Sequence, residues 1–118
     1  MAALVCTLAA GPAAAASTAY DQCLDKSGGV TSSMRDCSEA EGKRQNRELN
    51  AVYKRVMSRL DPAARLKLRN EERAWLKRMH NQCAALARGE GTSALLAADD
   101  CWISSNDKRI KALKRMEK

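Results

Sequence analysis

Apolar residues recur at intervals of three and four along two long stretches of the chain, on either side of Asp61-Pro62. This spacing predicts two amphipathic helices, over about 32–60 and about 62–88, that fold back on each other as an antiparallel hairpin. Asp61 can accept hydrogen bonds from free N–H groups of the first turn, and proline is tolerated at the first helical position, so the second helix should begin there. The predicted apolar faces are Leu49, Val52, Tyr53, Val56 and Leu60, then Ala64, Leu68, Trp75, Met79, Cys83 and Leu86.

Two further helices are expected to flank the hairpin. A short leading helix over Ala19–Lys26 should end at Gly28-Gly29, and Thr31 or Ser32 should then cap the first long helix. The segment Gly89–Gly91 breaks the pattern again, and Thr92 or Ser93 should cap a third, C-terminal helix. The shared face of that helix is predicted to hold Leu95, Ala98, Trp102, Arg109, Leu113 and Met116. The fold class is therefore all-α.

Composition agrees with one small helical domain of 118 residues. The chain has no Phe, two Trp and two Tyr, so its core is built mainly from Leu, Val, Ala and Met. A small helical core with so few large apolar side chains is marginal unaided, and we expect a covalent constraint to support it.

The first sixteen residues are apolar and uncharged and end in small residues, which predicts a secretory signal peptide over 1–16 and a mature domain over 17–118. The basic segment that usually starts a signal peptide is missing. The run is too short for a membrane helix, which needs about 20 residues, and Gly11-Pro12 interrupts it. A lipid anchor on Cys6 is a further alternative. We expect a periplasmic or secreted protein with no transmembrane helix in its mature form.

Removal of this segment leaves four cysteines, and an even number in a small exported domain predicts two disulfides. Their spacing lacks the close pairs of a zinc site, so neither a metal nor another cofactor is expected. Because the hairpin would bring Cys37 and Cys83 to similar heights, we favour the pairs Cys37–Cys83 and Cys23–Cys101. The main alternative joins neighbours in the chain, Cys23–Cys37 and Cys83–Cys101.

The same hairpin geometry places Asn50 and Glu72 level with each other, eleven residues before and after residue 61. With Arg73 they are predicted to form a structural hydrogen-bond network between the helices. Glu72 lacks a second carboxylate, nucleophile or metal partner, and His80 is expected on the solvent side of its helix. We therefore predict no catalytic residues and no enzyme activity.

Charge is unevenly distributed along the chain, which carries a net charge of +7. Residues 21–41 hold two basic and five acidic side chains, whereas residues 43–59 hold six basic and one acidic. Basic side chains on outer helix faces are normally solvated, and no aromatic residues interleave with them, so nucleic acid is not an expected partner. The candidate anion-binding residues are Lys43, Arg44, Arg47, Lys108, Arg109, Lys111, Lys114 and Arg115.

Four short motifs follow one another through the mature chain: T-x-x-M-x-x-C at 31–37, L-N-x-x-Y at 49–53, R-A-W-L at 73–76 and C-x7-R-x3-L at 101–113. In this order, and with four cysteines, they resemble the lysozyme-inhibitor LprI-like family of exported bacterial proteins. The resemblance implies a small, helical, disulfide-bonded protein of the bacterial envelope, and lysozyme inhibition in the namesake.

We therefore expect an exported binding protein that contacts a lysozyme or another envelope protein. Animal and phage lysozymes are typically basic, so a protein of charge +7 would approach such a target against electrostatic repulsion. The alternative function is a basic periplasmic adaptor that binds anionic wall polymers or lipid head groups through the candidate residues above.

Overall fold

A computed structural model describes residues 17–118 and confirms the all-α prediction, with no strand in this range. The helices are α1 (Thr18–Lys26), α2 (Thr31–Ser58), α3 (Pro62–Ala87) and α4 (Gly91–Arg115). They match the expected leading helix, hairpin and C-terminal helix to within a few residues. The signal-peptide prediction for 1–16 and the alternative at Cys6 lie outside the described residues.

The start of α3 follows the expected chemistry, whereas the starts of α2 and α4 do not. Asp61 Oδ1 accepts a hydrogen bond from the Ala64 N–H at 2.8 Å. At α2 and α4, however, the N-cap positions are Val30 and Glu90, which make no side-chain cap hydrogen bond. The expected caps at Thr31 or Ser32 and at Thr92 or Ser93 are therefore wrong, because each helix begins before its hydroxyl residues can occupy the cap position.

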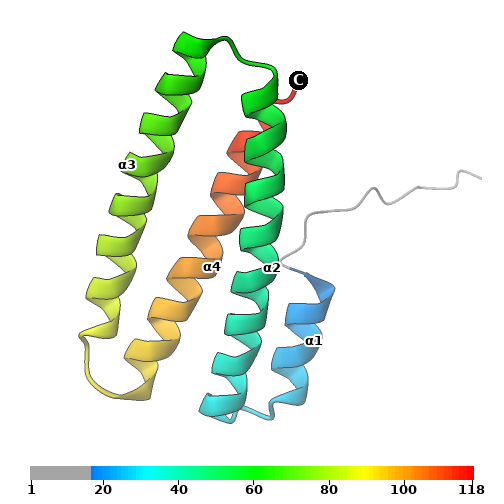
Figure 1. Cartoon of the computed structure of the whole chain (residues 1–118). Helices are drawn as coiled ribbons and strands as arrows, with labels where there is room; N and C mark the ends of the chain where they lie inside the picture. Colours follow the sequence, from blue (N-terminus) through cyan, green and yellow to red (C-terminus); the bar gives the residue numbers. More distant parts are fainter. Residues whose placement is uncertain (1–16) are drawn as a thin grey trace, which may run out of the picture.

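The hairpin of α2 and α3 forms, but α4 covers the faces that were expected to meet. In Figure 1, α3 runs back antiparallel to α2, and α4 then returns parallel to α2. Among the described helices, α4 packs against both α2 and α3, and these two form no comparable interface with each other. Within residues 17–118 the short α1 packs mainly on α2, so the lateral order of the helices is α3, α4, α2, α1.

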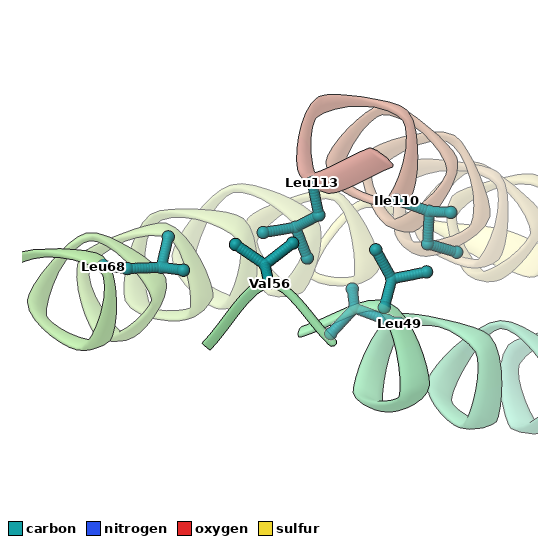
Figure 2. Packing of buried hydrophobic residues seen from close by; sticks show 6 residues of the cluster. Leu49, Val56, Leu68, Ile110 and Leu113 are labelled. Atoms are coloured by element: carbon teal, nitrogen blue, oxygen red, sulfur yellow. The ribbon is translucent and has the colours of Figure 1, made fainter. Parts of the chain in front are cut away.

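The hydrophobic core lies where α4 meets the two long arms near their shared turn. Its buried cluster comprises Leu49, Val52 and Val56 from α2, Leu68 from α3, and Ile110 and Leu113 from α4. Figure 2 shows the side chains of the three helices converging there. On the predicted faces, Leu60 and Trp75 are partly buried against this cluster, whereas Leu86 and Met116 are exposed. The prediction that Leu86 and Met116 belong to buried apolar faces is therefore wrong.

The disulfides join neighbours along the chain, so the favoured pairs Cys37–Cys83 and Cys23–Cys101 are wrong. Cys23–Cys37 links α1 to α2 with a Cα–Cα distance of 5.8 Å, and Cys83–Cys101 links α3 to α4 with a distance of 5.5 Å. The physical reason is the position of α4, which separates α2 from α3, while α1 lies on α2 and away from α4. The alternative pairing considered from the sequence is the one that forms.

Candidate binding surfaces

The predicted network of Asn50, Glu72 and Arg73 is not present. Asn50 and Arg73 are exposed, whereas Glu72 is buried. Glu72 Oε2 accepts a hydrogen bond from Arg109 Nε of α4 at 2.7 Å, so its partner comes from the helix that lies between the two arms. Asn50 and Glu72 do not meet as expected because α4 lies between α2 and α3, which would have to face each other directly for this contact.

The Glu72–Arg109 pair fixes α3 to α4. Both side chains are nearly buried, at 10% and 13% exposure, and Arg109 Nη2 also lies 2.6 Å from Glu72 Oε2. The Arg109 guanidinium carbon stands 5.7 Å from the centre of the Trp75 ring, within the range of a cation–π interaction. Within residues 17–118, however, Glu72 Oε1 is buried and has no hydrogen-bond partner. An acceptor of this kind is costly unless a donor reaches it.

A buried amide pair, not singled out from the sequence, joins α2 to α4. The Gln45 side chain is fully buried and donates through Nε2 to the Ile103 carbonyl oxygen at 2.9 Å. Its Oε1 accepts a hydrogen bond from Asn106 Nδ2 at 3.3 Å. The signal that could have found Gln45 is its spacing, since Cys37, Glu41, Gln45 and Leu49 recur every four residues on the buried face of α2.

A cluster of charges surrounds Glu41 at the junction of α1 and α2. The Ser17 hydroxyl donates to Glu41 Oε2 at 2.8 Å, and Arg44 Nη2 donates to Oε1 at 2.6 Å. Arg44 also bridges to Glu48, which accepts a further hydrogen bond from Lys114 of α4 at 2.6 Å. The cluster therefore connects α1, α2 and α4.

These contacts shift the titration of the two carboxyl groups. Burial alone would raise the pKa of Glu41, but hydrogen bonds from Arg44 and Ser17 outweigh it and hold that pKa below the ordinary value. The Lys114 hydrogen bond, aided by Arg44 and opposed by burial, lowers the pKa of Glu48. The pKa of Arg44 is raised, chiefly by its hydrogen bond to Glu41. All three groups are charged at neutral pH.

A groove of about 510 Å³ lies between α2 and α3, with α4 as its floor. Both tryptophans of the chain line it, together with exposed polar residues of the two arms, including Asn50 and Arg73. The residues of the expected network thus lie on one groove instead of forming a bonded cluster. The apolar lining residues are Leu49, Tyr53, Trp75, Leu76, Met79 and Trp102.

A second depression, of about 470 Å³, lies between α2 and α4 and is lined mainly by carboxylates among its charged residues; we call it the acidic hollow. Asp36, Glu39 and Asp99 line it, together with Arg35, whose Nε donates to Asp99 at 3.0 Å. Asp36 and Glu39 are exposed. Gly42 and Trp102 border both this hollow and the groove, so the two depressions adjoin.

Most of the candidate anion-binding residues are paired with carboxylates inside the molecule. Lys43 pairs with Glu39, Lys111 with Asp107, and Arg44, Arg109 and Lys114 with the carboxylates described above. Within residues 17–118, no such pair is formed by Arg47, Lys108 or Arg115. The predicted cationic surface of α2 and α4 is therefore largely neutralised at short range.

His80 is exposed, and its ring centre lies 5.6 Å from that of Trp102. In the described part of the chain, no three His, Cys, Asp or Glu side chains are grouped so that they could hold a metal ion. Across residues 17–118, no helix has both the length and the apolar character needed to cross a membrane.

Comparison with known families gives one match, to the family described as "Lysozyme inhibitor LprI", over residues 23–113. The match begins at the first disulfide cysteine and ends at the core residue Leu113, so it spans parts of all four helices. No curated protein matches significantly, and no solved structure does so either.

Proposed function

This chain belongs to the lysozyme inhibitor LprI family, and from that membership we propose that it is an exported protein that binds a lysozyme and inhibits it by protein–protein contact. The observation that carries the proposal is the family match, which extends over most of the helical domain. Two disulfides support a site of action in an oxidising compartment, and we propose the periplasm or the medium outside the cell. The proposed activity is binding and not catalysis.

The acidic hollow is the surface that we propose for contact with a basic lysozyme. Its exposed carboxylates are Asp36, which forms no ion pair within residues 17–118, and Glu39, which also pairs with Lys43 at 3.2 Å. At physiological ionic strength charges are screened over about 8 Å, so a docking protein responds to the local patch more than to the distant net charge. A local acidic surface thus supports approach to a basic target by a protein of charge +7.

The proposal is tested with chain secreted by an exporting host and purified with both disulfides intact. We expect it to slow lysis of bacterial cells by hen lysozyme, and to do so less at high salt. The double variant Asp36→Asn, Glu39→Gln should inhibit more weakly. Glu71→Gln is the matched control, because Glu71 is an exposed carboxylate on α3 outside the hollow.

Two results would count against the proposal in different ways. If the wild-type chain did not inhibit lysozyme but bound anionic vesicles or wall polymer in a salt-dependent manner, the adaptor function would replace inhibition. If the wild-type chain inhibited and the double variant did so equally well, inhibition would stand and the acidic hollow would be the wrong surface.

A further inference from the structure

The groove between α2 and α3 presents apolar surface that the protein itself does not cover. Trp75 and Trp102 are only partly buried, and Leu76, which also lines the groove, is 47% exposed. Helices of small domains normally turn such side chains toward one another, and here α4 holds the two arms apart. An open apolar groove of this size is typical of an interaction site.

Glu72 is a buried charged residue in the wall of the groove. It is 8% exposed, and its Oε1 atom and Arg109 Nη2 are both buried without a hydrogen-bond partner. The two atoms belong to one ion pair, so the unpartnered donor lies beside the unpartnered acceptor, and neither is open to an occupant of the groove. Recognition by the groove therefore rests on its apolar walls and on the cations that line it.

The α3 wall of the groove is positively charged. Four exposed cations recur every four residues along α3, and two of them, Arg69 and Arg73, line the groove. Within residues 17–118 none of the four forms an ion pair with a carboxylate, in contrast to the paired cations of α2 and α4. The row consists of Arg65, Arg69, Arg73 and Lys77.

The dimensions of the groove correspond to a short helix. Its lining extends over residues 42–53 of α2 and 69–79 of α3, and at 1.5 Å per residue these stretches are roughly 15 Å long, or about three helical turns. The arms are antiparallel with α4 between them, and the groove is lined by all three helices, so a docked helix would pack against each of them, as helices do in a bundle. Amphipathic helices bind other proteins by laying their apolar face in such grooves.

We infer that the groove binds an acidic amphipathic helix of a partner protein. Its apolar face packs on the two tryptophans, and its carboxylates approach Arg69 and Arg73. An anionic polymer would use the cations but not the apolar walls. The surface and its charge differ from those of the acidic hollow, so this site does not depend on lysozyme inhibition.

The test uses a synthetic, Trp-free helical peptide with Leu at the i, i+3, i+4 and i+7 positions and Glu on both flanks. A matched peptide carries Lys in place of Glu. Since both tryptophans of the chain line the groove, their fluorescence reports its occupancy directly. We expect the acidic peptide to bind at least about tenfold more tightly than the basic one, with affinity falling as salt rises.

Variants locate the binding. Arg69→Gln with Arg73→Gln should lower the affinity for the acidic peptide by about tenfold, and Leu76→Asn should lower the affinity for both peptides. Lys43→Gln with Lys111→Gln is the control that removes two exposed cations on other helices and should change little. Circular dichroism establishes that each variant is folded.

Three outcomes would overturn the inference: equal affinity for the two peptides, unchanged affinity in the folded arginine variant, or preferential occupation of the groove by another class of ligand. The last is measured with laurate and with vesicles containing phosphatidylglycerol. A tryptophan response to either that exceeds the response to the acidic peptide would assign the groove to a lipid.

Discussion

Individual buried polar residues hold α4 in its place against α2. Gln45 is the central one, because it bonds both a backbone carbonyl and the Asn106 amide across the interface. Gln45→Leu keeps a side chain of similar size but leaves Asn106 Nδ2 without its acceptor. We expect the free energy of unfolding to fall by about 1–3 kcal/mol in urea titrations.

Asn50→Leu is the matched control for Gln45→Leu. Asn50 is exposed and lies beside the groove, so this change should alter stability by no more than about 0.5 kcal/mol. A larger loss for Asn50→Leu than for Gln45→Leu would contradict the observed packing and restore the register expected from the sequence. The sequence could not separate these two amides, since burial depends on which helix covers which face.

The charge cluster around Glu41 makes stability depend on pH. The pKa values of Glu41 and Glu48 are lowered on folding, so the folded state binds fewer protons than the unfolded chain as these groups titrate. Their stabilising contribution is complete above the ordinary carboxyl pKa, near 4.3, and is lost as pH falls through the lower folded values.

We therefore expect melting temperatures to drop as pH is lowered from about 5 to about 3, through the ordinary carboxyl range. Glu41→Gln should flatten part of this drop, because the variant lacks one of the two titrating groups. Glu71→Gln, on exposed surface, should leave the slope unchanged. An identical pH dependence in wild type and Glu41→Gln would show that Glu41 does not contribute.

At the scale of the helices, the sequence predicted well which helices form, where they begin and end, and that α2 and α3 run antiparallel. Glycine breaks, the Asp61-Pro62 start and the three-and-four periodicity are local signals, and they locate α1 to α4 closely. Which apolar face meets which is not local. Ile103 and Ile110 of α4 are buried but were absent from the predicted face, because a stripe that contacts two helices is wider than one that contacts a single partner.

The disulfides test this arrangement of helices. Trypsin digestion without reduction should yield one linked pair that joins the peptide ending at Lys26 to peptide 36–43, and another that joins 79–88 to 89–108. These pairs follow from α1 on α2 and α3 on α4. A linked pair containing Cys37 and Cys83 would instead require α2 and α3 to face each other, and would contradict the packing of α4 between them.

For the whole molecule, net charge is a poor guide to its surfaces. The sequence total of +7 combines cations paired within α2 and α4, an acidic hollow between these two helices, and a row of cations on α3 that form no ion pair within residues 17–118. Chain order showed the acidic segment but not the hollow, which also needs Asp99 from α4. The sequence did not reveal the groove either, since the groove exists only because α4 holds the two arms of the hairpin apart.

The local disulfides divide the protein into two halves, each with its own covalent link. One bond lies within α1–α2 and the other within α3–α4, and the chain crosses between the halves only at the α2–α3 turn near Asp61. The large interface between α2 and α4 is noncovalent. Chain cleaved at this turn should therefore persist as a two-fragment complex that separates in denaturant and reassembles on dilution with neither disulfide broken, so the two halves could serve as complementing fragments.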